Sequence, residues 1–265
     1  MSKTKRYATK YPILLIHGLN CRDERPFEYF GRIPSWLEGQ GVKVYLGGQD
    51  ATGTIQSNAR FLKKRLQRIL KKEQCGKVNI IAHSKGGLEA RYLISSLGMA
   101  PYVASLTTLS TPHYGSRTAK RWCQRKRFVH IYSRISDFMW KKMGDEKPDV
   151  EKVLKELTPA SMRVFNRKNP DSPLVYYQSF GARLNKKNRR GDDKLMRVLR
   201  LFVFGLDGEN DGLVAPESAQ WGVYRGTIEN ISHQDLVDSR KKDVKGFCMT
   251  KFYGRLIWDL AERGF

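Results

Sequence analysis

Ser84 lies between small residues in the segment Ala82-His83-Ser84-Lys85-Gly86, where the chain changes character. Residues 78–82 are an apolar, β-branched run typical of a buried strand, and residues 88–94 favour a helix. A serine at such a turn can form a nucleophile elbow, in which a strained backbone lifts the hydroxyl above the strand end. The usual pattern is Gly-x-Ser-x-Gly, and Ala82 takes the place of its first glycine. The pattern predicts a nucleophilic serine, with an ordinary turn serine as the alternative.

A serine hydroxyl needs a histidine base that a carboxylate holds in place. Proteins with this elbow carry serine, acid and histidine in that order along the chain. That order selects His233, which stands in a loop before the final helical region, and Asp211, which lies in a turn sequence, Glu209-Asn210-Asp211-Gly212. Asp207 is the local alternative for the acid. Asp235 is close to His233 along the chain and is not preferred.

Acyl transfer to Ser84 would also need backbone N–H groups that bind the developing oxyanion. Lys85 follows the nucleophile directly and is expected to supply one donor. The segment His17-Gly18-Leu19 ends the first apolar run, and Leu19 is the expected second donor. Such a donor contributes about 3 kcal/mol of transition-state stabilisation in other hydrolases.

The elements that would hold these residues alternate along the chain. Apolar runs predict strands and periodic segments predict helices between them. The strands are expected at residues 11–16, 42–46, 78–82, 102–110, 174–181 and 198–204, and the helices at 34–40, 57–72, 88–94 and 244–262. This alternation predicts a mostly parallel central sheet with helices on both faces.

The alternation stops between residues 116 and 169, where the sequence is helical, basic and rich in aromatic residues. An insertion after a sheet strand could form a helical cap or lid over the active site. The alternative is a set of extra core helices. With no linker or internal repeat, residues 1–265 are expected to form a single domain that contains this insertion.

Composition limits the other possibilities. A chain of 265 residues can bury a full core, and it contains no apolar run long enough for a transmembrane helix. The N-terminus is basic but lacks the apolar segment of a signal peptide, so the sequence predicts a cytoplasmic protein or one secreted without such a signal. The cysteines are scattered without metal-ligand spacing and are expected to be free thiols: Cys21, Cys75, Cys123 and Cys248.

The chain is strongly basic, with 49 Lys and Arg against 26 Asp and Glu and a formal net charge of +23. Such a charge attracts anionic lipid surfaces and other polyanions. The cations do not build a recognised nucleic-acid module, and in the segment 61–70 they flank the apolar stripe of a helix. We therefore expect peripheral attraction to anionic lipids and no specific nucleic-acid partner.

The motifs together resemble the bacterial triacylglycerol lipases of the Pseudomonas and Proteus type, within the α/β-hydrolases. The matching segments follow the order found in that family: 11–19, 78–91, 110–116, 210–214 and His233-x-Asp235. The resemblance implies Ser84 as nucleophile, Asp211 as acid and His233 as base, with Leu19 and Lys85 as oxyanion donors. It also implies a lid at residues 116–169, a lipid ester as substrate and a bacterial source.

The sequence departs from that family at several positions. Lys85 replaces a common glutamine or methionine, and its side chain is expected to add positive charge at the mouth of the site. The cysteine that often follows the Asn-Asp-Gly-Leu-Val motif is absent. The resemblance requires no cofactor but implies a possible structural calcium ion, held by Asp235 together with Asp192 or Asp193.

The sequence thus predicts a serine carboxylic-ester hydrolase, a lipase or esterase that cleaves acyl esters such as triacylglycerols through an acyl-enzyme intermediate. An acyltransferase or a phospholipase could use the same triad. A basic, non-catalytic module that binds anionic membranes is the alternative from a different class.

Overall fold

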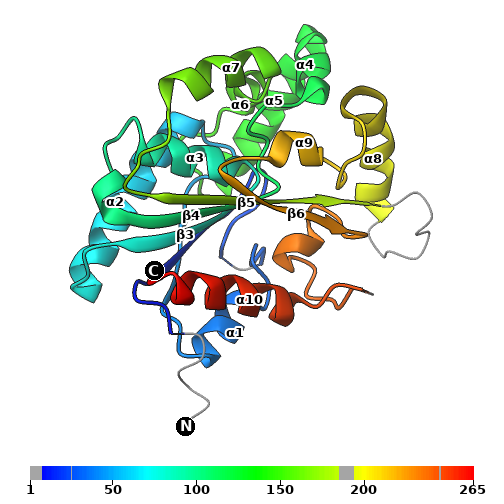
Figure 1. The fold of residues 1–265 in the computed structure, drawn as a ribbon. Coiled ribbons are helices and arrows are strands. Elements are labelled where there is room, and N and C mark those ends of the chain that lie inside the picture. Colours follow the sequence, from blue (N-terminus) through cyan, green and yellow to red (C-terminus); the bar gives the residue numbers. More distant parts are fainter. Residues whose placement is uncertain (1–7, 25, 185–193, 245) are drawn as a thin grey trace.

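One parallel sheet organises the protein (Figure 1). The computed structural model describes residues 8–24, 26–184, 194–244 and 246–265. In these residues six strands pair in the order β2-β1-β3-β4-β5-β6, and every neighbouring pair is parallel. The strands are β1 (Ile13–Ile16), β2 (Val44–Leu46), β3 (Val78–His83), β4 (Val103–Leu109), β5 (Tyr176–Arg183) and β6 (Val223–Glu229). The expected α/β-hydrolase architecture is therefore confirmed in outline.

Helices cover both faces of the sheet, which explains why its central strands are buried on both sides. On one face α1 (Ile33–Gly39) and α10 (Met249–Glu262) pack against the sheet, and on the other lie α2 (Ile55–Glu73) and α3 (Lys85–Ile94). The strands β1, β3 and β4 are buried along their whole length. Because all strands run in one direction, the residues that follow them meet at one edge of the sheet.

The segment between residues 116 and 169 contains four helices: α4 (Arg117–Cys123), α5 (Lys126–Lys142), α6 (Val150–Glu156) and α7 (Pro159–Lys168). They lie together on the α2 and α3 side of the sheet (Figure 1). The buried carboxylate of Asp145 joins this group to the body, since it accepts hydrogen bonds from the amides of Ala51 and Thr52 and pairs with Arg22.

In the late part of the chain one prediction was wrong and one strand was missed. The expected strand at residues 198–204 lies within helix α8 (Lys194–Asp207), where buried Met196 and Val203 alternate with exposed Leu195, Val198 and Leu201 at helical spacing. The edge strand β6 was not predicted, because it is largely exposed and carries charged residues and a glycine.

Short helices complete the chain: α9 (Pro216–Ala219) and the 3-10 turns η2 (Ala100–Tyr102) and η3 (Asp235–Val237). No described helix is both long and apolar enough to cross a bilayer. All four cysteines are free, as expected.

Candidate active site

Ser84 sits in a strained turn between β3 and α3. Its backbone has φ 53° and ψ −132°, a positive φ that is unusual for a residue with a side chain. The Ser84 amide donates to the carbonyl of Leu109 at the end of β4 (2.9 Å). The following glycines permit the turn, because a Cβ on Gly86 would strike the carbonyl of His17 and one on Gly87 would strike Thr111. The geometry is that of a nucleophile elbow.

The side chains of His233 and Asp211 form a direct pair. The Nδ1–H of His233 donates to Oδ2 of Asp211 at 2.8 Å, and the His233 amide donates to the Asp211 carbonyl at 2.9 Å. The other oxygen of Asp211 accepts the amides of Leu213 and Val214 (3.0 and 2.9 Å). Both partners are buried, so Asp211 fixes the ring orientation of His233 and leaves its Nε2 as the free nitrogen.

The pair lies beside the elbow. The ring of His233 packs against that of His83, the residue before Ser84, with 4.3 Å between ring centroids. Nδ1 of His83 accepts a hydrogen bond from the hydroxyl of Tyr29 (2.6 Å). Burial, and secondarily the charge of His233, hold the pKa of His83 well below its usual range. His83 is therefore neutral at physiological pH and adds no competing charge next to His233.

The element that precedes Asp211 in the chain differs from the expected one. It was expected to follow a strand, but it follows helix α8. The amide of Leu184, just beyond β5, donates to the carbonyl of Asn210 (2.9 Å), which holds the turn against the end of that strand. The Asn210 side chain accepts the Gly212 amide (2.8 Å), a turn that the Asn-Asp-Gly sequence favours.

The segments that carry the two predicted oxyanion donors lie beside Ser84. A Cβ on Gly18 would come within 2.8 Å of the Ser84 Cβ and 3.3 Å of its Oγ, so the loop that leads to Leu19 passes directly over the hydroxyl. Lys85 opens helix α3, and in the described part of the chain no side chain caps that helix. The first N–H groups of a helix lack intrahelical partners and can therefore bind an anion.

The Lys85 side chain does not lie at the mouth of the site, so that prediction was wrong. It is 1% exposed, ion-paired with Glu89 and hydrogen-bonded to the carbonyl of Gly53. Glu89 also accepts from the side chains of Asn58 and Gln49. The side-chain amide of Gln49 (Nε2) in turn donates to the carbonyl of His17 (3.0 Å) and so holds the loop beside Ser84. Sequence reasoning missed Gln49 and Glu89, whose roles depend on contacts distant in the chain.

The two alternative aspartates have other partners. Asp207 binds the start of α4, where it accepts the amides of Arg117 and Thr118 (2.7 and 3.0 Å). Asp235 accepts the amide and the hydroxyl of Ser232 and pairs with Arg240. In the structure, His233 is therefore paired with Asp211.

The proposed calcium ligands do not fit the ion as far as the structure describes them. The Asp235 carboxylate is already neutralised by Arg240, which would repel a cation. Asp192 and Asp193 lie outside the described residues. Among the described residues, no group of three or more His, Cys, Asp or Glu side chains could hold a metal ion.

Comparison with known proteins decides the family. The sequence profile of the palmitoyl protein thioesterases matches residues 12–246, which include Ser84, Asp211 and His233. The chain belongs to this family. It is 31% identical over 260 residues to triacylglycerol lipase 2 of Saccharomyces cerevisiae, a match that covers 90% of this chain and 74% of that protein. It is 27% identical to a triacylglycerol lipase of Pseudomonas fragi, over 87% of this chain and 88% of that one.

Solved structures agree on the fold. The crystal structure of Staphylococcus hyicus lipase matches with a TM-score of 0.73 at 15% identity, over 99% of both chains. The sequence matches confirm the resemblance to triacylglycerol lipases. Within its family, this protein is a carboxylic-ester hydrolase.

Proposed function

We propose that Ser84, His233 and Asp211 form a catalytic triad that hydrolyses acyl esters of lipids. The observation that carries the proposal is the 2.8 Å hydrogen bond from His233 to Asp211 beside the strained Ser84 elbow. Asp211 would hold the histidine tautomer whose Nε2 is a base and would stabilise the imidazolium that forms.

In the proposed reaction, Ser84 Oγ attacks the acyl carbonyl while His233 Nε2 takes its proton. The amides of Lys85 and Leu19 bind the oxyanion, in keeping with the open start of α3 and the close approach of Gly18. His233 then returns the proton to the leaving alkoxide, which departs as an alcohol and leaves acyl-Ser84. Water, deprotonated by His233, hydrolyses this ester and restores Ser84.

Triacylglycerols are the proposed substrate class, because the relatives that match most of the chain carry the name triacylglycerol lipase. The matching family is described as palmitoyl protein thioesterase, so thioesters of long-chain acids are the second candidate. A phospholipid substrate or an acceptor alcohol in place of water would use the same residues and would change only the leaving or attacking group.

We further propose that α4–α7 act as a cap over the site and that the basic surface attracts anionic lipid aggregates, to which a lipase must bind before it reaches its substrate. The formal charge of +23 supports this attraction.

The test is hydrolysis of p-nitrophenyl esters from acetyl to palmitoyl, together with palmitoyl thioesters and glycerides, by wild type and Ser84→Ala. We expect all activity to depend on Ser84 and to increase with chain length. Preference for glycerides would support a lipase, and preference for thioesters would support the second candidate. A wild type that is inert on every substrate, or a Ser84→Ala variant of equal activity, would refute the proposal.

A further inference from the structure

Helix α5 buries one face and exposes apolar side chains on the opposite face. The inner face is buried and consists of Val129, Ser133, Ser136 and Trp140. The outer face is exposed: Ile131 is 61%, Ile135 58% and Phe138 61% accessible to solvent. Both sets repeat at the three- and four-residue spacing of one helical stripe. The outer stripe has no role in packing this chain, and such exposed apolar surface marks a binding site.

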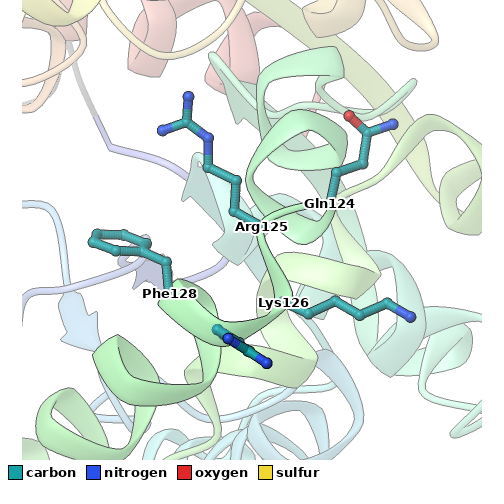
Figure 2. A pocket seen from close by; sticks show the side chains of 5 residues that line it. Gln124, Arg125, Lys126 and Phe128 are labelled. Atoms are coloured by element: carbon teal, nitrogen blue, oxygen red, sulfur yellow. The ribbon is translucent and has the colours of Figure 1, made fainter.

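Aromatic side chains extend the stripe at the junction of α4 and α5. The rings of Phe128 and Tyr132 stack with an interplanar angle of 3°, and Trp122 lies 5.5 Å from Phe128 between centroids. All three are 40–52% exposed. Figure 2 shows the shallow hollow at this turn, with Arg125 and Phe128 projecting to one side and Lys126 to the other. Aromatic rings with cations beside them are typical of residues that sit at a membrane–water interface.

The charged residues of α4 and of α5 as far as residue 136 are all basic, while Asp137 follows on α5 and Glu151 of α6 contacts His130. Between residues 117 and 136 there is no Asp or Glu, and the cations are Arg117, Lys120, Arg121, Arg125, Lys126, Arg127 and Arg134. These Arg and Lys side chains would repel a second copy of a chain that carries +23 and would attract an anionic partner. Nucleic acid would satisfy the cations but would leave Ile131 and Ile135 in water. An anionic bilayer satisfies both the cations and the apolar side chains.

We propose that the outer face of α5 and the α4–α5 turn form a membrane-docking surface, in which Trp122, Phe128, Ile131 and Ile135 enter the headgroup region of an anionic bilayer and the surrounding Arg and Lys bind lipid phosphates. The surface is already exposed in this structure, so docking requires no opening of the cap. The proposal builds on the proposed lipid hydrolysis but is tested without it.

The experiment measures binding to phosphatidylcholine vesicles with and without phosphatidylglycerol. Ile131→Ser/Ile135→Ser should weaken binding to the anionic vesicles by about 100-fold, because two inserted side chains are lost. Arg125→Gln/Arg127→Gln should weaken it by about 30-fold. The matched controls lie on α10 across the sheet: Trp258→Ser removes an aromatic residue that is 47% exposed, and Lys251→Gln/Arg255→Gln removes the same charge. Both controls should bind as wild type does.

A second readout is tryptophan emission, which should shift to the blue on vesicle binding in wild type and Trp258→Phe but not in Trp122→Phe. Equal loss of binding in the α10 controls would overturn the proposal and leave only a general charge effect. Unchanged vesicle binding by Ile131→Ser/Ile135→Ser would also overturn it. So would a nucleic acid that displaces the wild-type protein from the vesicles, if all charge variants on α5 and α10 lose vesicle binding equally. Ser84→Ala should bind fully, and the docking variants should hydrolyse a soluble short-chain ester at the wild-type rate, which separates docking from catalysis.

Discussion

Lys85 and Glu89 form an ion pair that solvent does not reach, one helical turn apart at the start of α3. Their side chains are 1% and 0% exposed. The pair is hydrogen-bonded to Asn58 and Gln49, and Gln49 also binds the carbonyl of His17. The Lys85 backbone is expected to give an oxyanion donor. Its side chain, through Glu89 and Gln49, joins α3 to the loop that contains His17, on the other side of Ser84.

Glu89→Gln should therefore lower the free energy of unfolding by about 3–5 kcal/mol, because it leaves the Lys85 ammonium buried without a counter-charge. Urea unfolding measures the change. The double variant Lys85→Met/Glu89→Gln should recover most of the loss, since the carboxamide oxygen introduced at position 89 can still accept from Asn58. A double variant as unstable as the single one would show that the charge pair is not the cause.

Asp211→Asn should reduce kcat by about 10⁴-fold, because an amide no longer holds the base tautomer of His233. The control is Asp207→Asn, which replaces one of the two oxygens that accept from the amides of Arg117 and Thr118 and should cost about 1 kcal/mol of stability while kcat stays unchanged. Measurement of kcat on a soluble ester distinguishes the effect of Asp211→Asn from that of Asp207→Asn. The reverse pattern would mean that Asp207 is the acid.

Asp235→Asn should alter stability rather than turnover, because its carboxylate binds Ser232 and Arg240. Calcium should not raise the melting temperature of wild type, and a chelator should not lower it. A calcium-dependent rise in wild type that Asp235→Asn abolishes would show that the aspartate binds calcium in spite of Arg240.

Asp145→Ala should destabilise the fold by about 3–5 kcal/mol, since it leaves Arg22 and the amides of Ala51 and Thr52 without their acceptor. Thermal and urea unfolding would measure this. Asp243→Ala is the matched control, because the Asp243 side chain is 94% exposed and its pair with Arg32 should contribute at most about 1 kcal/mol. Similar losses in both variants would contradict the importance of the buried contact.

Acid should destabilise the protein partly through His113. Burial, and then the charge of Arg91, hold the pKa of His113 well below its usual range. The unfolded chain binds a proton as the pH falls through about 6.5, while the folded chain does not, so stability is lost toward low pH by up to about 1.4 kcal/mol per pH unit. His113→Asn should show a shallower loss between pH 7 and pH 5 in urea unfolding. Identical slopes would exclude this contribution.

The elbow and the positions along the chain of the strands before and after it could be predicted from the sequence because they depend on local signals. A β-branched run, a serine with small neighbours and a glycine pair determine a tight strand-to-helix turn, whatever the rest of the chain does. Asp211 and His233 followed from their order after Ser84, and the structure brings their side chains into contact.

The parts that could not be predicted depend on contacts between distant segments. Residues 198–204 are apolar enough for a strand, but their helical pattern becomes visible only with Leu195 and Met196 included. The side chain of Lys85 was expected in solvent because nothing near it in sequence other than Glu89 suggests burial. Its remaining partners, Gly53 and the side chains around Glu89, come from the β2–α2 segment and could be found only from the fold.

The most direct test of the central claim is the covalent reaction of the enzyme with a fluorophosphonate, which forms a stable ester only with an activated serine. Intact mass and peptide mapping should show one phosphonyl group on Ser84 in wild type, none in Ser84→Ala and much slower labelling in Asp211→Asn. Labelling at another serine, or labelling of Asp211→Asn at the wild-type rate, would contradict the assignment of Ser84, His233 and Asp211 as the catalytic triad.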